Sequence, residues 1–268
     1  MRSLREPVPI VFWSNSAETR RNWGDALNPL LVRALTGRMP IHASTVYALG
    51  RPVYALIGSV LKTASDFRAL EIWGSGLKSP GGFRHPPRRV HAVRGPLTRQ
   101  VLLNQGVKCP QVFGDPALLY PRFFSVRPGF PRFRLGLIPH YFDQEALRIR
   151  SRLHEDDEVC TIDILAGIED VANQVASCAA IASSSLHGLV LADALGIPNV
   201  RLKITDRIVG GDFKYRDYFE SVGRRPEDCV LLRPDTTVAD IEGSVFDGRI
   251  DIDLDALLAC CPLPRPDG

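Results

Sequence analysis

The sequence predicts an α/β protein made of two units, each with a parallel β-sheet, that face one another across a cleft. Short apolar segments rich in β-branched residues alternate with helical patterns along most of the chain. The chain has 268 residues, more than the roughly 150 of a common single domain. A proline-rich, basic stretch at 120–134 interrupts the alternation. We therefore expect one domain over residues 1–125 and a second over 126–268.

In the first unit, β-branched and aromatic residues at 7–13 predict a strand. A single leucine-rich face predicts a helix over 22–37, with Asp25 or Asn28 as its N-cap and Gly37 at its end. The further predicted segments are strand-to-turn units at 53–61 and 69–77, a strand, turn and helix at 90–106, and a strand edge at 111–119.

The alternation resumes in the second unit, where apolar runs at 135–141, 158–165 and 179–183 predict strands. Helical patterns lie between and after these strands, and 201–223 is predicted to be a basic loop. The predicted helices cover residues 143–153 (with Asp143 as cap), 167–178, the segment that begins at 186, 236–246 and 251–261.

Composition restricts the class of protein. The chain is 45% apolar and 24% charged, as in soluble globular proteins, and its net charge of +3 does not indicate nucleic-acid binding. No apolar stretch approaches the 18 or so residues of a membrane span, and the first residues lack the apolar segment of a signal peptide. We expect a cytoplasmic protein whose six cysteines are reduced, structural thiols without zinc-ligand spacing.

The candidate site lies in the loops after the strands, because ligands of open α/β sheets bind beyond the carboxyl ends of the strands. These loops offer glycines, hydroxyls and helix N-termini, which suit a small anion. The G-x-G-x-x-G and P-loop motifs are absent, and "DID" at 251–253 is better explained as helix capping than as a metal-binding pair. The cationic candidates for an anion contact are Arg94, Arg99, Lys203 and Lys214.

Seven motifs occur in an order that resembles the polysaccharide pyruvyl transferase family, most closely its branch that acts on bacterial exopolysaccharides. They are "NWGDALNPLL", "GSG", "VRGPLTRQVL", "GDPALLYP", "IPHYFD", "SSSLHGLVLADALGIPNV" and "GDFKYRDYFESVG", between residues 22 and 223. The resemblance implies two Rossmann-like domains in a glycosyltransferase-B-like arrangement. It also implies transfer of pyruvate from phosphoenolpyruvate to a sugar as a cyclic ketal, with release of phosphate.

Ketal formation from phosphoenolpyruvate needs a clamp for two anionic groups, a proton for the methylene carbon and a base for the attacking hydroxyl. His187 is the predicted acid, neutral in the free protein and protonated when the anion binds. Asp25 is the candidate base, although it could instead cap its helix. Phosphoenolpyruvate is a co-substrate, so no other cofactor and no metal are expected. The predicted phosphoenolpyruvate contacts are Gly24, Gly74, Ser75, Arg94, Ser185, Leu186, His187 and Lys214.

A second group of residues is predicted to meet the acceptor or to support the site. His140 ends a strand, and Asp115 either serves the acceptor or fixes a turn before its proline. Tyr215 and Tyr218 could stack on a sugar or pack between the domains. Some branches of the family have arginine two residues before the histidine, where this chain has Ser185. The clamp here must then depend on Arg94 and Lys214, or hold the anion differently.

The predicted partners are phosphoenolpyruvate and a saccharide or lipid-linked oligosaccharide at the inner face of the cytoplasmic membrane. The basic segments 120–134 and 201–216 could contact that surface or simply be solvated. Two other functions are compatible with the predicted fold, because fold alone does not determine function. One is a glycosyltransferase that uses a nucleotide sugar, and the other is a non-catalytic member of a polysaccharide assembly complex.

Overall fold

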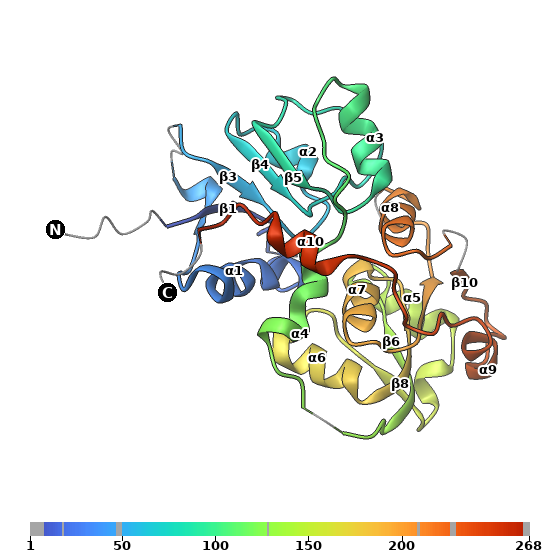
Figure 1. Cartoon of the computed structure of the whole chain (residues 1–268). Helices are drawn as coiled ribbons and strands as arrows, with labels where there is room; N and C mark the ends of the chain where they lie inside the picture. Colours follow the sequence, from blue (N-terminus) through green and yellow to red (C-terminus); the bar gives the residue numbers. More distant parts are fainter. Residues whose placement is uncertain are drawn as a thin grey trace.

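The computed structural model describes residues 8–17, 19–46, 50–127, 129–207, 210–225 and 229–264. Within them the chain forms two five-stranded sheets in which all paired strands are parallel (Figure 1). Helices connect the strands and cover the sheets. The prediction of an α/β fold with two parallel sheets is confirmed.

The first sheet has the strand order β2-β1-β3-β4-β5. Its helices are α1 (Trp23–Thr36), α2 (Leu61–Ala64) and α3 (Pro96–Asn104), and the 3₁₀ turns η1 (Ala43–Thr45) and η2 (Pro116–Leu119) complete this half. The strands are β1 (Ile10–Phe12), β2 (Ile41–His42), β3 (Val53–Ala55), β4 (Leu70–Trp73) and β5 (Arg89–Ala92).

The second sheet has the order β10-β9-β8-β6-β7. Read from the other edge, this is β7-β6-β8-β9-β10, so the strands follow the same order as in the first sheet. Its strands are β6 (Phe133–Ile138), β7 (Val159–Thr161), β8 (Cys178–Ser183), β9 (Asn199–Lys203) and β10 (Cys229–Leu231). The other elements are α4 (Tyr120–Phe123), α5 (Gln144–Arg150), η3 (Leu153–Glu155), α6 (Ile168–Ala176), α7 (Leu186–Ala194), α8 (Phe213–Ser221), α9 (Val238–Glu242) and α10 (Leu254–Ala259).

This shared order determines where a ligand can bind. In a doubly wound sheet of this order, the chain reverses direction across the sheet between its first and third strands, and ligands bind at that switch point. The switch points here lie between β1 and β3 in the first sheet and between β6 and β8 in the second. The loops after these four strands are therefore the natural site of function.

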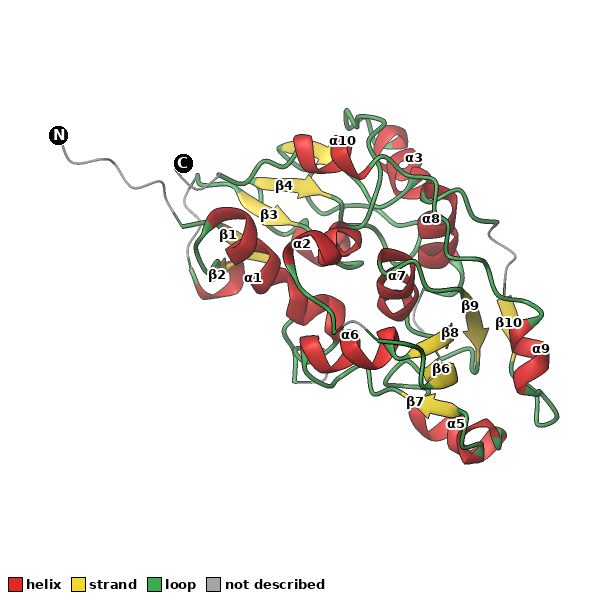
Figure 2. Cartoon of the chain, turned by 60° about the horizontal axis from the view of Figure 1, so that its bottom comes forward, coloured by secondary structure: helices red, strands yellow, loops and turns green. Residues whose placement is uncertain are grey.

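Helices α1 and α7 lie between the two sheets (Figures 1 and 2). Helix α7 is apolar on all sides and buried over Leu186 to Asp193, as expected of a helix with no solvent face. One apolar cluster joins the halves, because it contains Leu27 and Leu31 of α1 together with Leu189 and Val190 of α7. The two sheets therefore share part of their core.

The first helix has the predicted extent but a different N-cap. Asn22 is the N-cap of α1, so Asp25 lies inside the first turn and Asn28 inside the helix, and neither is the cap. Gly37 ends the helix in the left-handed conformation with φ of 71°, as predicted. Asp25 is thus free of a capping role.

The prediction of a loop over 201–223 is wrong. Strand β9 continues into its start, and α8 occupies residues Phe213–Ser221. Tyr215, Tyr218 and Phe219 have the i, i+3, i+4 spacing of a helix face, and all three are buried. The basic residues around them obscured an ordinary amphipathic pattern.

A hydrogen bond connects the C-terminal helix to the first sheet. Helix α10 returns to the first sheet, where the Trp73 indole Nε1–H donates to the Leu257 carbonyl over 2.8 Å. Asp253 caps this helix by accepting from the Ala256 N–H, which confirms the capping interpretation of "DID". The division at residue 125 stays a prediction, because both halves share core and the end of the chain crosses back.

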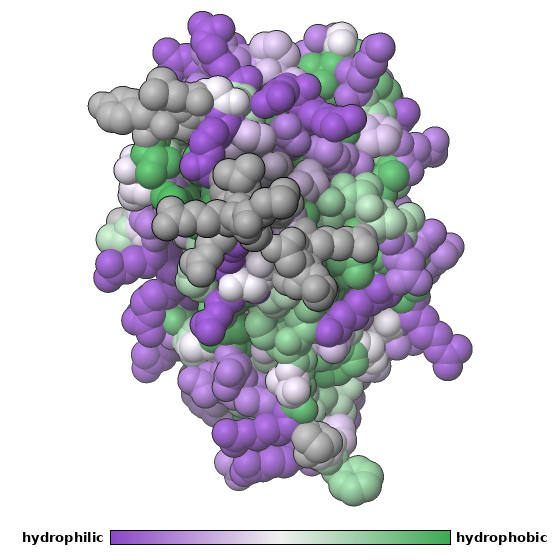
Figure 3. Space-filling view, turned by 60° about the vertical axis from the view of Figure 1, so that its left-hand side comes forward, coloured by the Kyte–Doolittle hydropathy of each residue, from purple (hydrophilic) through white to green (hydrophobic). Residues whose placement is uncertain are grey.

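None of the helices in the part of the chain that the structure describes is long and apolar enough to cross a bilayer. Hydrophilic side chains cover much of the face seen in Figure 3, with hydrophobic ones in patches between them. The six cysteines are free thiols, as predicted.

A buried ion pair joins the loop after β5 to α8. Arg94 and Asp217 are fully buried, with 2.8 Å between Nη2 and Oδ2, and Asp217 also accepts from the Thr98 N–H and hydroxyl. We predict that Asp217→Ala lowers the free energy of unfolding by about 3–5 kcal/mol, because it leaves a buried guanidinium without its counter-ion. The exposed pair of Arg122 and Asp255 provides the matched control.

Urea unfolding of the two variants measures this difference. Asp255→Ala is expected to cost less than about 1 kcal/mol, since exposed ion pairs contribute little. Equal losses from both variants would contradict a structural role for the Arg94 and Asp217 pair.

Candidate functional site

A pocket of about 400 Å³ lies at the switch points of both sheets, within the usual size range of small-molecule sites. The loops after β1 and β3 form one side, and those after β6 and β8, with α8, form the other. Its lining residues are Phe12, Trp13, Ser14, Asn15, Thr19, Asn22, Asp25, His42, Ser44, Gly58, Ser59, Val60, Thr63, Lys78, His140, Tyr141, Ser185, Leu186, His187 and Lys214.

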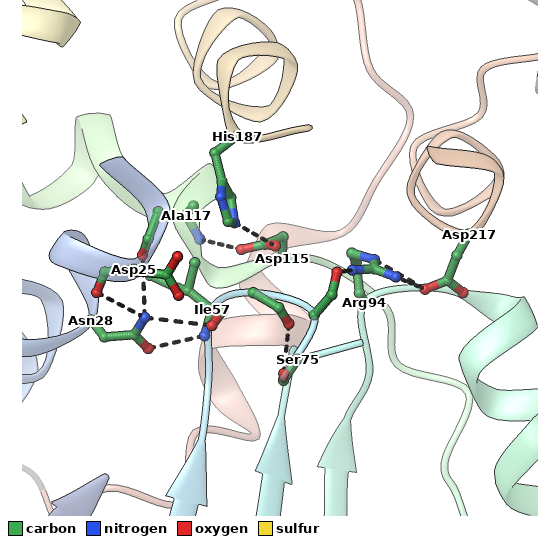
Figure 4. A network of polar contacts seen from close by, with 12 residues as sticks. Asp25, Asn28, Ile57, Ser75, Arg94, Asp115, Ala117, His187 and Asp217 are labelled. Atoms are coloured by element: carbon green, nitrogen blue, oxygen red, sulfur yellow. Dashed lines mark hydrogen bonds and ion pairs between the residues drawn. The ribbon is translucent and has the colours of Figure 1, made fainter. Parts of the chain in front are cut away.

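His187 enters the pocket from the first turn of α7 and lies against α1 (Figure 4). A Cβ atom at Gly24 would stand only 2.1 Å from the His187 Nδ1, so only glycine permits this approach. His187 Nε2 lies 3.9 Å from Oδ2 of Asp115, and both atoms are buried without a hydrogen-bond partner. This distance is too long for a hydrogen bond, so a buried donor–acceptor pair is left unsatisfied.

Burial lowers the pKa of His187 to about 3, with further lowering by the positive charges of Lys214 and Arg94. With this pKa the imidazole is neutral at pH 7. Protonation there requires negative charge from a ligand.

Asp25 is a buried carboxyl group at the pocket wall. Burial raises its pKa to about 7, while a hydrogen bond from the Ser14 backbone N–H and the charge of Lys78 act in the opposite direction. Its position is fixed because Asn28 joins α1 to the loop after β3, accepting from the Ile57 N–H at 3.1 Å (Figure 4). A carboxyl group with this pKa can accept or donate a proton near neutrality.

Two lysines give the pocket its positive charge. Lys214 comes from α8 and is buried, and burial lowers its pKa to about 7, helped by the charges of Arg94, Lys78 and Arg201. Lys78 follows β4 and also lines the pocket. No ion pair joins the Lys214 ammonium to any residue that the structure describes, so the site has unneutralised cationic capacity.

The three serines after β8 divide into two roles. The hydroxyls of Ser183 and Ser184 hold the corner, since Ser183 accepts from the Ser185 N–H and Ser184 accepts from the His140 N–H. Ser185 is the N-cap residue of α7 but makes no side-chain capping bond, and it lines the pocket. The N-terminus of α7 and the Ser185 hydroxyl thus face the same space as the lysines.

His140 and Leu186 also line the pocket, as predicted for ligand contacts. His140 Nδ1 accepts from the Phe142 N–H, so a neutral ring carries its proton on Nε2. Burial lowers the pKa of His140 to about 3, and Lys214 and Lys78 lower it further. His140 is therefore a neutral group of the pocket.

Arg94, the predicted clamp, lies behind the pocket wall. Its side chain is fully buried and donates to Asp217, to the Leu77 carbonyl and to the hydroxyl of Ser59, which lines the pocket. The structure therefore gives Arg94 a supporting place, from which its charge still influences His187 and Lys214.

Tyr215 and Tyr218 are also placed away from the pocket. The Tyr215 hydroxyl donates to the Ser184 carbonyl, and the Tyr218 hydroxyl donates to Asp193. Both rings are almost completely buried, so neither presents a face on which a sugar could stack. Their contribution is packing beneath the site.

Gly74, Ser75 and Asp115 support the wall rather than line it. A Cβ at Gly74 would lie 2.3 Å from Pro116, and the Ser75 hydroxyl donates to the Gly58 carbonyl. Asp115 caps η2 through the Ala117 N–H, which confirms the turn role weighed for it. Burial raises the pKa of Asp115 to about 6, so a nearby histidinium would favour its ionised form.

Sequence reasoning missed Lys78 and the residues after β1 and β2. Lys78 follows the "GSG" turn by two positions, so its place after a strand was a signal that could have been used. Trp13 directly follows β1, and His42 is the last residue of β2. Strand β2 is only two residues long, so its sequence showed no strand pattern. These residues form the part of the pocket that the predictions lacked.

Residues 87–205 match the family model described as polysaccharide pyruvyl transferase. The matched range runs from β5 to β9 and contains Asp115, His140, Ser185 and His187, so the resemblance is confirmed over this part of the chain and indicates a transferase. A relative is the uncharacterized protein L143 of Acanthamoeba polyphaga mimivirus, 28% identical over 247 residues, which are 88% of this chain and 83% of that protein. No solved structure matches, so the glycosyltransferase-B-like arrangement stays a prediction.

The contact between Gly24 and His187 gives a direct test. Alanine normally stabilises a helix by about 1 kcal/mol relative to glycine, but Gly24→Ala should destabilise the protein by about 1–3 kcal/mol through overpacking. Thermal unfolding measures it, with Gly81→Ala as control, because no atom lies closer than 3.9 Å to a Cβ there. The double variant Gly24→Ala/His187→Ala should recover stability, and a neutral Gly24→Ala would refute the packing argument.

Ionisation of Asp25 gives a second test. The unfolded carboxyl ionises near pH 4 and the folded one near pH 7, so wild-type stability is lost as the pH rises through this range. Asp25→Asn removes that cost, and its free energy of unfolding should exceed that of wild type by roughly 2–4 kcal/mol at pH 8. At pH 4 the two proteins should be nearly equal.

Chemical unfolding across this pH range makes the comparison, with the exposed Asp235→Asn as control. A difference between wild type and Asp25→Asn that does not depend on pH would contradict the raised pKa.

Proposed function

We propose that the protein transfers pyruvate from phosphoenolpyruvate to a saccharide, forming a cyclic ketal and releasing phosphate. The observation that carries this proposal is the pairing of a neutral, unpartnered histidine with a raised-pKa carboxyl and two lysines in one pocket. The family match supports a pyruvyl transferase in general terms. The donor, the ketal product and the residue roles are the content of the proposal.

The anionic donor binds to Lys214, Lys78 and the N-terminus of α7. A helix N-terminus has free N–H groups and a positive dipole end, and both favour phosphate or carboxylate. The two lysines replace the charge that arginine supplies two residues before the histidine in some branches of the family, where this chain has Ser185. Ser185 then contributes a hydroxyl hydrogen bond and no charge.

Donor binding supplies the charge that protonates His187. One full negative charge at 4 Å and an effective dielectric of 20 contributes about 4 kcal/mol, which corresponds to a rise of about three in pKa. Starting from about 3, this brings the pKa of His187 close to neutrality in the complex. Asp115, 3.9 Å from Nε2, stabilises the imidazolium once it forms.

The reaction then proceeds by proton transfers that balance. His187 protonates the methylene carbon of phosphoenolpyruvate, which places positive character on the neighbouring carbon. An acceptor hydroxyl attacks that carbon and gives its proton to Asp25. Phosphate leaves with the electron pair of the C–O bond, the second hydroxyl attacks the same carbon, and its proton goes to solvent or phosphate. His187 recovers its proton for the next cycle.

The acceptor in this proposal is a saccharide or lipid-linked oligosaccharide at the inner face of the cytoplasmic membrane. The pocket has a volume of about 400 Å³ and is also lined by residues after β1 and β2, which leaves room for more than the small donor. No other cofactor is required by the proposed steps.

Thermal unfolding in the presence of phosphoenolpyruvate tests donor binding. A ligand at 100 times its Kd stabilises the native state by about 2.7 kcal/mol, so a rise in Tm is expected. In Lys78→Gln and Lys214→Gln, the apparent affinity for phosphoenolpyruvate, obtained from the dependence of Tm on its concentration, should fall at least tenfold. Lys108 is an exposed lysine outside the pocket, and Lys108→Gln should not change this affinity. Stabilisation by UDP- or GDP-sugars, with no response to phosphoenolpyruvate, would indicate a glycosyltransferase, and no response to either would indicate a non-catalytic protein.

The acid role of His187 has its own test. His187→Asn should retain phosphoenolpyruvate binding within about tenfold, because the lysines remain, but should reduce phosphate release in the presence of acceptor by at least 10²-fold. Release of phosphate is followed by ³¹P NMR. Turnover of His187→Asn near the wild-type rate would exclude the acid role.

A further inference from the structure

The pocket has two ends of different chemistry. Lys214, Lys78 and His187 occupy the inner end, where the proposed donor binds. The residues after β1 and β2 form the other end, and none of those that line the pocket there carries a full charge: Phe12, Trp13, Ser14, Asn15, His42 and Ser44. A neutral ligand with apolar and hydroxyl surfaces suits such an end.

Trp13 is the central side chain of this neutral end. It is half-buried, with part of its ring packed on the shared core and part lining the pocket. The ring meets His42 edge to face, with 4.4 Å between the ring centroids. A tryptophan held in this way presents a rigid apolar surface at little entropic cost on binding.

His42 holds Trp13 in place. Its Nδ1 accepts from the Ser44 N–H, because a backbone N–H can only donate. Its Nε2 must then carry the proton and donate to the Trp13 carbonyl at 2.9 Å. Both ring nitrogens are occupied, so His42 acts as a brace for Trp13.

The neutral end lies beside the candidate base. Ser14, the next residue after Trp13, donates its backbone N–H to Asp25. The Ser14 hydroxyl lies 2.8 Å from that of Thr19, which fixes the start of this loop. A ligand on Trp13 is therefore next to the carboxyl group that would take a proton from a hydroxyl.

We propose that Trp13, braced by His42, is the stacking platform of the acceptor-sugar subsite, with Asn15 and Ser44 as hydrogen-bonding groups. The apolar face of a neutral pyranose ring packs on the indole, and its hydroxyls point toward Asp25. This assignment rests on the proposed function for the direction of transfer, but the binding of a neutral sugar to Trp13 can be measured without the donor. It replaces Tyr215 and Tyr218, which are buried.

Tryptophan fluorescence provides a selective test. The chain has three tryptophans, and Trp23 and Trp73 are fully buried, so Trp13 is the one that a ligand can reach. Methyl glycosides of glucose, galactose, mannose and N-acetylglucosamine, and short oligosaccharides of these sugars, serve as probes. At least one should change the emission of the wild-type protein in a saturable way, and Trp13→Phe should abolish the change.

Calorimetry measures the affinity for the sugar independently of tryptophan fluorescence. Trp13→Ala should weaken binding of the responsive sugar by about tenfold, equivalent to ~1.4 kcal/mol, and Trp13→Phe should retain most of the affinity because it keeps an aromatic face. The control is Phe130→Ala, which removes an aromatic side chain that is 94% exposed and outside the pocket. In a transfer assay, Trp13→Ala should raise the KM for the acceptor with little change in the KM for phosphoenolpyruvate.

The outcomes distinguish this inference from the proposed function. Stabilisation by phosphoenolpyruvate with no saturable sugar binding, or with sugar binding unchanged in Trp13→Ala, would overturn the subsite and leave the donor site intact. Sugar binding that depends on Trp13, with no response to phosphoenolpyruvate, would support the subsite and reject the proposed donor.

Discussion

The site depends on one close contact, in which the imidazole of His187 lies against the backbone of Gly24. This contact brings the N-terminus of α7, in the second half, onto the first turn of α1, in the first half. Both helices begin at the carboxyl ends of strands that flank a switch point, so the contact also brings the two switch points together. A side chain at position 24 would separate them and open the pocket.

The same contact contributes to the electrostatics of the pocket. By helping to bury the site, it favours a neutral His187, an Asp25 carboxyl group that is about half protonated at pH 7 and a Lys214 amine with a pKa of about 7. Burial makes the charged form of each of these groups less favourable than it is in water. An anionic ligand offsets this cost for the cationic forms of His187 and Lys214, so ligand binding and the protonation of these two groups are coupled.

Much of the fold and part of the site could be predicted from the sequence. Apolar runs identified seven of the ten described strands, while β2, β9 and β10 were not predicted. Strand-end position identified Asp25, His140 and His187 as pocket residues. The errors have physical causes: Arg94 has the residue type of an anion clamp, but the sequence does not reveal Asp217, 123 positions away, which binds it. Trp13 was missed because its place in the pocket depends on His42, which lies on the neighbouring strand β2 and is distant in the sequence.

The central claim is that this pocket joins phosphoenolpyruvate to a sugar, and mass measurement of the acceptor tests it most directly. The protein is incubated with ¹³C-labelled phosphoenolpyruvate and candidate lipid-linked or free oligosaccharides, with His187→Asn in parallel. We expect an acceptor that gains the labelled pyruvyl group as a ketal, in equal amount to the phosphate released, and no such product from His187→Asn. An unchanged acceptor mass across sugars that bind the protein, or a product that gains a hexose from a nucleotide sugar, would contradict the account.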